Sequence, residues 1–216
     1  MKRRLAISLA TCTGLISASM FASAAHAQQG PYNYFSRTPE TERVLRSNET
    51  HHLGKGTDYL RAGTTAGLGS AKSEFDFILN LWPNHPGVLS LQADTLIRLG
   101  QGHLIEQYFG RAYQMTPDVA QLRVVHGVAL LRQNKVKESI EQLRRGVELD
   151  ESSVNGHYNL GLALVSAKRY EEANLHAQRA YALGHPLPGL RDQLKRAKAW
   201  NPGAAAPAAE ADKKPQ

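Results

Sequence analysis

Histidines and neighbouring carboxylates are the residues of this chain whose types and spacing could support chemistry. His51 and His52 are adjacent, so on a helix their side chains point about 100° apart, and a shared metal ion would need ligands from elsewhere. The acidic pairs Glu171-Glu172 and Asp150-Glu151 have the composition of general acid–base sites. Acids here also suit turns and the first turns of helices, so we expect them to be solvated structural residues.

Sequence motifs that would identify an enzyme are absent from the chain. It contains no Cys-x-x-Cys, His-Glu-x-x-His, Walker phosphate loop, dinucleotide glycine fingerprint or Gly-x-Ser-x-Gly. We therefore expect a protein that is not an enzyme and that uses no cofactor and no metal ion. A measured turnover that depended on one histidine or glutamate would reverse this expectation.

A period of 34 residues organises the chain from Pro86 onward. Small residues recur where two helices would cross closely, and leucines recur where a helix would face a core. The columns hold Ala93, Gly127 and Gly161; Leu96, Leu130 and Leu164; Ala112, Gly146 and Ala180; and Met115, Leu149 and Leu183. This period is typical of stacked helix-turn-helix units, which bind partners rather than catalyse reactions.

These units resemble the tetratricopeptide repeat family. The resemblance is clearest in residues 154–187, which follow the family pattern of leucine-glycine, tyrosine and alanine positions. The matching residues there are Leu160, Gly161, Leu164, Tyr170, Ala173, Ala177 and Ala180. Residues 86–119 and 120–153 match the same pattern in most columns, so the motifs are specific for the fold but name no partner.

Four positions depart from the family pattern. Gln92 and His126 stand where leucine is usual, Ser139 stands where alanine is usual, and His157 replaces the tryptophan. We interpret these departures as degeneracy of the repeat. His126 and His157 are accordingly expected to be packing residues rather than catalytic bases.

The predicted fold is an all-α solenoid of about three and a half tetratricopeptide units with a C-terminal capping helix. The first unit is expected to be degenerate, because Gly54, Gly56 and Gly63 each weaken its first helix by about 1 kcal/mol relative to alanine. The predicted segments are an extension with a short helix (28–51), a degenerate unit (52–85), three units (86–119, 120–153 and 154–187), a capping helix (188–200) and a disordered Pro/Ala tail (201–216).

Residues 1–27 have the pattern of a secretory signal peptide. Basic residues at 2–4 precede an apolar stretch, and Ala25-His26-Ala27 provides a small-x-small cleavage site. An uncleaved membrane anchor is the alternative, and the small polar residues of the stretch disfavour it. We therefore expect a periplasmic or secreted protein that begins at Gln28.

Composition limits the partners of such a mature chain. Removal of the leader takes away the single cysteine, so no disulfide can form, and it leaves 23 basic against 19 acidic residues. This modest excess does not indicate nucleic-acid binding. No later stretch approaches the ~20 apolar residues of a membrane span. The expected partner is a protein or peptide.

The resemblance implies a binding surface on the concave face, which the first helix of each unit lines in this family. The implied residues are Asp94, Ile97, Arg98, Gln121, Val124, Val128, Leu131, Arg132, Asn155, Tyr158, Leu162 and Val165. The strip is apolar for a solvent-facing surface, and Arg98 and Arg132 share a column at its edge. An apolar strip between fixed polar groups suits a docked helix or extended peptide.

Two functions remain open at this stage. The first is an exported scaffold or adaptor that binds a protein in this groove, within an envelope assembly or secretion system. The second is a binder of envelope polyanions that uses Arg98, Arg132 and Arg144-Arg145, and whose affinity would fall steeply with salt. The N-terminal segment or the tail could also fold back and occupy the groove.

Overall fold

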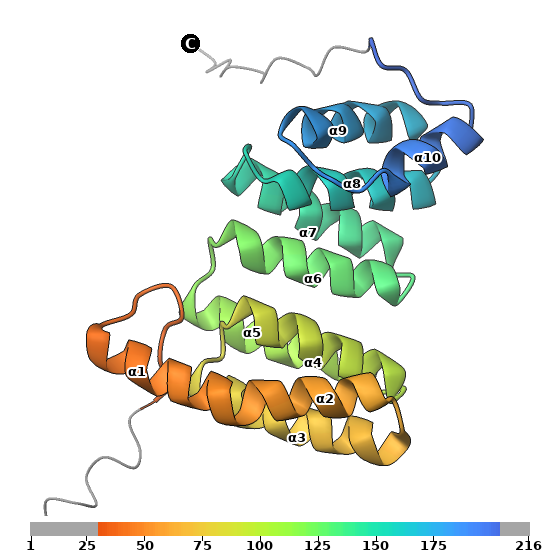
Figure 1. Cartoon of the computed structure of the whole chain (residues 1–216). Coiled ribbons are helices and arrows are strands. Elements are labelled where there is room, and N and C mark those ends of the chain that lie inside the picture. The colour runs from red at the N-terminus through yellow and green to blue at the C-terminus, as the bar shows by residue number, and fades with distance from the viewer. Residues whose placement is uncertain (1–29, 204–216) are drawn as a thin grey trace, which may run out of the picture.

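The computed structural model describes residues 30–203, all of whose regular structure is helical (Figure 1). Residues 1–29 and 204–216 lie outside the described residues, and so does the predicted signal peptide at residues 1–27. The elements are α1 (Pro39–Asn48), the π-helical turn η1 (Glu49–Leu53), α2 (Gly54–Ala62), α3 (Thr65–Leu81), α4 (Pro86–Arg98), the 3-10 turn η2 (Gly102–Leu104), α5 (Ile105–Met115), α6 (Ala120–Arg132), α7 (Val136–Leu149), α8 (Val154–Ser166), α9 (Tyr170–Ala182) and α10 (Gly189–Arg196).

The helices form antiparallel pairs that stack into an elongated array (Figure 1). We call α2, α4, α6 and α8 the A helices, and α3, α5, α7 and α9 the B helices. Each A helix packs on the B helix that follows it, and α4, α6 and α8 also contact one another in sequence. The array runs from α1–α3 at one end to α8–α10 at the other. The predicted all-α tetratricopeptide solenoid is confirmed.

The turn from A helix to B helix is built identically in three successive units. It contains one residue with a left-handed backbone, at Gly100, Asn134 and Lys168, which are 34 positions apart. Each of these turns closes with two backbone hydrogen bonds back to the A helix. The bonds are Gly100 N–H to Ile97 O and Gln101 N–H to Leu96 O, Asn134 to Leu131 and Lys135 to Leu130, and Lys168 to Val165 and Arg169 to Leu164. This is the Schellman arrangement, which satisfies the last carbonyls of a helix.

Glycines mark the closest approaches between helices. A Cβ atom at Gly127 would lie 2.5 Å from Leu143 Cγ on α7, and one at Gly146 would lie 2.9 Å from Val124 Cγ2 on α6. At Gly161 the added Cβ would lie 2.4 Å from Leu190 Cδ2 on α10. Real Cβ atoms do not approach other heavy atoms this closely, so the small columns are steric requirements of the stacking.

The first A helix is longer and more regular than its glycines predict. Helical backbone continues from α1 through η1 into α2 without a break, so the helix crosses the predicted boundary at residue 52. Gly56 is required there, because its Cβ would lie 2.5 Å from Phe75 Cε1 on α3. Gly63 ends the helix with a φ of 71°. Tertiary packing therefore outweighs the low helix propensity of this segment.

Residues 30–37 form a strap against the loop that joins α3 to α4. Tyr32 N–H donates to Leu81 O at 2.7 Å, and its ring lies 4.9 Å from that of Trp82. The buried Asn84 side chain accepts from Tyr34 N–H at 2.9 Å and donates to Asn33 Oδ1 at 2.7 Å. The groove columns take no part in these contacts.

The C-terminal cap is shorter than predicted, and ordered contacts continue beyond it. Helix α10 ends at Arg196, where the capping helix was expected to reach residue 200. It buries Leu190 and Leu194 against α8 and α9. Asn201, placed by prediction in a disordered tail, donates its N–H to Asn174 Oδ1 at 3.0 Å and accepts from Asn174 Nδ2 at 2.9 Å.

The buried apolar residues form two clusters that meet at α6. The first extends from Leu45 on α1 to Leu122 and Ala129 on α6, and the second from Val124 on α6 to Leu194 on α10. Between them, Tyr113 Oη lies 3.0 Å from His126 Nδ1, and Arg123 donates to Gln142 Oε1 at 2.9 Å. The junction of the two clusters is therefore partly polar.

A pair of histidines links α8 to α9 inside the last unit. His157 Nδ1 and His176 Nδ1 lie 2.9 Å apart, and His157 Nε2 lies 3.0 Å from Glu151 O. His157 therefore donates from Nε2 and accepts at Nδ1, which leaves His176 as the donor between the rings. Burial lowers the pKa of His157, and burial together with the neighbouring imidazole lowers the pKa of His176 to about 4.

This pair predicts a loss of stability in acid. His176 stays neutral in the folded chain down to about pH 4, whereas an unfolded histidine takes up a proton below about pH 6.5. The free energy of unfolding should therefore fall as the pH decreases from about 6.5 to about 4, by up to about 3 kcal/mol from this residue. Urea denaturation at several pH values should show a smaller decrease for His176→Phe than for the wild type. His103→Gln, which removes an exposed imidazole, should leave the decrease unchanged.

The close approaches predict a second effect on stability. Gly161→Leu and Ala180→Leu should each lower the free energy of unfolding by about 1–3 kcal/mol, because no space exists for the added atoms. Gly110→Ala on α5 is the matched control: its Cβ would meet nothing within 4 Å, so the change should stabilise the chain by about 0.5–1 kcal/mol. Chemical denaturation measures all three. An unchanged midpoint for Gly161→Leu would contradict the docking of α10 on α8.

Candidate functional site

The candidate site is a strip of apolar side chains along one face of α4, α6 and α8, which we call the groove strip. Its members Ile97, Val128, Leu131, Leu162 and Val165 are half-buried, each resting on the core while part of its surface stays open to solvent. Direct contacts between α4 and α6, and between α6 and α8, hold the three helices in register. The strip is therefore continuous across three units.

Two residues predicted to line the groove are buried instead. Tyr158 is 9% exposed, because the ring of His185 stacks on it with centroids 3.7 Å apart. Val124 is 7% exposed and packs near Gly146 of α7. Neither presents a useful surface to a partner, so the open part of the strip is narrower than the sequence predicts. Gln121 and Asn155 are exposed at the N-terminal ends of α6 and α8.

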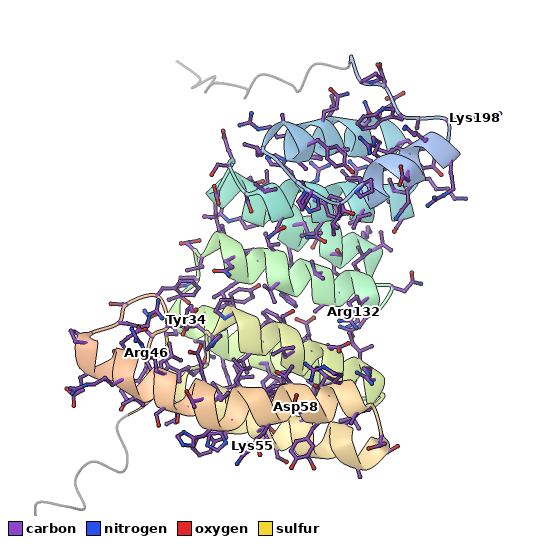
Figure 2. All side chains as sticks on the ribbon, in the orientation of Figure 1. Tyr34, Arg46, Lys55, Asp58, Arg132 and Lys198 are labelled. Atoms are coloured by element: carbon purple, nitrogen blue, oxygen red, sulfur yellow. The ribbon has the colours of Figure 1, made fainter. Side chains whose placement is uncertain are left out.

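A cluster of charges closes one edge of the groove strip. Asp94 on α4 pairs with Arg132 on α6, which Figure 2 labels, and lies 3.9 Å from Arg98. Arg98 also donates to Leu60 O at 2.8 Å and so caps the end of α2. Asp94 therefore links two successive A helices. The sequence does not predict this contact, because the paired residues lie on different helices.

The other arginines proposed for polyanion binding are also paired. Arg144 contacts Glu172 of the next unit, and Arg145 reaches Asp118 and Glu148 at 3.2 and 3.3 Å. A polyanion at these positions would have to displace a carboxylate from each arginine. Exposed pairs of this kind contribute only about 0–1 kcal/mol each, so they are structural links of modest strength.

Apart from the pair His157 and His176, the histidines have separate partners. His52 Nδ1 lies 2.6 Å from Glu74 Oε2, whereas His51 Nδ1 lies 2.7 Å from Ser47 O. His126 is 3% exposed, stacks on Phe109 with centroids 4.3 Å apart, and has a pKa lowered by burial. It is a packing residue, as the repeat register predicts.

Two further properties constrain the chemistry of the described residues. Across residues 30–203, no three of the His, Cys, Asp and Glu side chains are grouped so as to hold a metal ion. Within the same residues, no helix has both the length and the apolar character required to cross a bilayer. The predicted acidic pairs serve as structural partners: Glu172 binds Arg144 and Arg169, and Asp150 accepts from Ser152.

Comparisons with known proteins agree with this geometry. The family model described as TPR repeat matches residues 127–168, which run from the second half of α6 through α7 and α8 to the turn after α8. Among curated proteins, the chain is similar to protein O-mannosyl-transferase TMTC3 of Homo sapiens, with 32% identity over 93 residues that cover 42% of this chain. The Mus musculus protein of the same name is 32% identical over 88 residues, or 40% of this chain. In both cases the match spans 10% of the relative.

Solved structures with a similar arrangement of helices include MamA and YrrB. The MamA protein is 17% identical, with a TM-score of 0.48 over 70% of this chain and 89% of that one. YrrB, described as a TPR protein with an unusual peptide-binding site, is 21% identical, with a TM-score of 0.47 over 73% of this chain and 84% of that one. The 34-residue helix-turn-helix units described above give residues 30–203 the architecture of a tetratricopeptide repeat array, and the family match covers residues 127–168 of it.

Proposed function

We propose that this protein is an exported scaffold or adaptor that binds a protein or peptide through the groove strip. Tetratricopeptide arrays act generally as scaffolds for protein–protein interaction, and that level of function follows from the fold. The finer proposal is that the protein works in a bacterial periplasm, within an envelope assembly or secretion system. The leader-like pattern of residues 1–27 supports this location.

The continuous, half-open apolar strip is the observation that supports binding. Leu131 and Val165 occupy the same position of successive A helices, and Val128 and Leu162 lie one turn earlier in each. A partner that laid an apolar face along them would bury all four together, and the core beneath holds them in place. Such preorganised contacts cost little conformational entropy on binding.

The array's own strap does not compete for the strip in this arrangement. The strap packs on residues 81–85 through Tyr32, Asn33 and Tyr34. The polyanion alternative finds less support, because Arg98, Arg132, Arg144 and Arg145 all pair with carboxylates. The chain spans about a tenth of the curated transferases it matches, so it gives no ground for proposing their activity.

Binding in the groove predicts a site-specific effect of truncation. The double variant Val128→Ala, Leu131→Ala should weaken the affinity for a captured partner by more than about 1 kcal/mol, as loss of interface anchors does. The partner is first trapped in envelope extract with a photo-crosslinking residue at Leu131, and its affinity for each variant is then measured by calorimetry.

The matched control truncates two half-buried valines on α7, Val136→Ala and Val147→Ala, which remove similar apolar area from a B helix. This control should lose comparable stability but keep the affinity. A crosslinker at the exposed Glu141 of α7 should trap the partner poorly. Equal loss of affinity in both double variants, or equal crosslinking from Leu131 and Glu141, would rule out the groove strip as the binding surface.

A further inference from the structure

The positive charge of the described protein is concentrated at one end of the array. Residues 30–167 contain fourteen Lys or Arg and fourteen Asp or Glu, so this body is neutral. Residues 168–203 contain seven Lys or Arg against three Asp or Glu. The excess positive charge of the described residues therefore lies in the turn between α8 and α9, in α9 and α10, and in the segment that follows α10.

Four of these basic residues gather around the C-terminal end of α10. We call Lys168, Lys195, Arg196 and Lys198 the terminal basic face. All four are exposed, and Lys168 and Lys198 line the same cleft of about 650 Å³. Lys195 and Arg196 form the last turn of α10. Figure 2 labels Lys198 at this end of the array.

The four side chains are not neutralised by the carboxylates around them. None of them lies within ion-pair distance of an Asp or Glu among residues 30–203. The nearby acids are Asp192, one turn before Lys195 on α10, the exposed Glu171, and Glu172, which is occupied by Arg169 and Arg144. Three acids therefore face seven basic residues at this end, and Asp192 is within ion-pair distance of none of the four. Along the A and B helices of the body, most arginines pair with carboxylates, and Arg111 and Arg123 donate to amide and carbonyl oxygens. The terminal basic face differs in bringing together four cations that have no ion-pair partner among the described residues.

Apolar side chains accompany the basic residues. Leu187 is 58% exposed, the most exposed of the large hydrophobic residues described. Its carbonyl accepts from Tyr181 Oη at 3.1 Å, and the ring of Trp200 meets the same tyrosine edge-on at a centroid distance of 6.0 Å. Trp200 is half-buried, two residues beyond Lys198. Lysine and arginine beside an exposed leucine and a tryptophan match the chemistry of a membrane–water interface.

We propose that the terminal basic face binds the surface of a membrane that contains anionic phospholipids, with Lys168, Lys195, Arg196 and Lys198 on the phosphates and Trp200 at the headgroup level. The array then stands on the membrane by its C-terminal end. The part of the groove strip on α4 and α6 then lies away from the lipid, whereas its α8 end, which includes Val165, lies close to the terminal basic face. The inference does not depend on the groove being the partner site.

The test measures binding of residues 28–216 to vesicles by flotation. This chain keeps every described residue and omits the apolar leader, which would enter bilayers by itself. The protein should bind vesicles of phosphatidylcholine mixed with phosphatidylglycerol, and should not bind phosphatidylcholine alone. Each basic side chain near an anionic surface strengthens binding about fivefold, so Lys195→Gln, Arg196→Gln should weaken binding by about tenfold or more.

The matched control is Lys55→Gln, Lys137→Gln, which removes the same charge from exposed lysines of the body. Lys55 lies at the opposite end of the array (Figure 2), so this variant should keep the affinity within about twofold. Tryptophan emission gives an independent measure. Trp82 is fully buried, so a blue shift on binding to vesicles reports Trp200.

Three results would overturn the proposal. The first is no binding to the anionic vesicles, and the second is an equal loss in both double variants, which would indicate a general effect of net charge. The third is binding that poly-glutamate displaces completely without any shift of Trp200 emission in vesicles, which would assign the face to an acidic protein. Thermal denaturation of each variant checks that the fold is retained.

Discussion

The array depends on how closely neighbouring helices can approach. A helix pair of this kind cannot bury its apolar side alone, so each unit needs the next one. Residues without bulk fix the distance between the paired helices of a unit and between the last unit and its cap. Gly127, Gly146 and Gly161 each stand where a Cβ would come closer than 3 Å to a side chain of another helix. These approaches seat α6 on α7 and α10 on α8, and the A helices so positioned contact one another from α4 to α6 to α8, which makes their apolar residues one strip.

Much of the fold can be predicted from the sequence, because the residues that must be small and the residues that must be buried recur at fixed positions of the repeat. The glycine and alanine columns predict which helices cross closely, and Leu96, Leu130 and Leu164 are all buried at 2% exposure or less. The left-handed turn residues could also have been found by the same register. Gly100 and Asn134 share a column and are the residue types that tolerate that backbone, and Lys168 completes it.

The departures from the repeat pattern could not be interpreted from the sequence, because their partners lie on other helices. Gln92 donates to Asp76 Oδ1 at 2.7 Å, and Ser139 donates to Gly127 O at 2.7 Å. Both residues are hydrogen-bonded polar groups of the core, and of their side-chain atoms only Gln92 Oε1 has no partner among the described residues. The burial of Tyr158 was equally hidden, since it depends on His185, which follows the last repeat helix. The repeat register predicts which residues occupy equivalent positions. Whether one of these residues is exposed to solvent depends on side chains from distant parts of the sequence.

The meeting of the two apolar clusters at α6 has a mechanical consequence. On either side of α6 the helices are held by apolar burial, which resists separation because any gap costs contact energy. At α6 itself, part of the contact is made by hydrogen bonds among Tyr113, Arg123, His126 and Gln142 rather than by apolar packing. We therefore expect any bending of the array to be concentrated at α6, where the two clusters meet. The groove strip crosses this point, so its curvature can adjust to a bound segment while both cores remain closed.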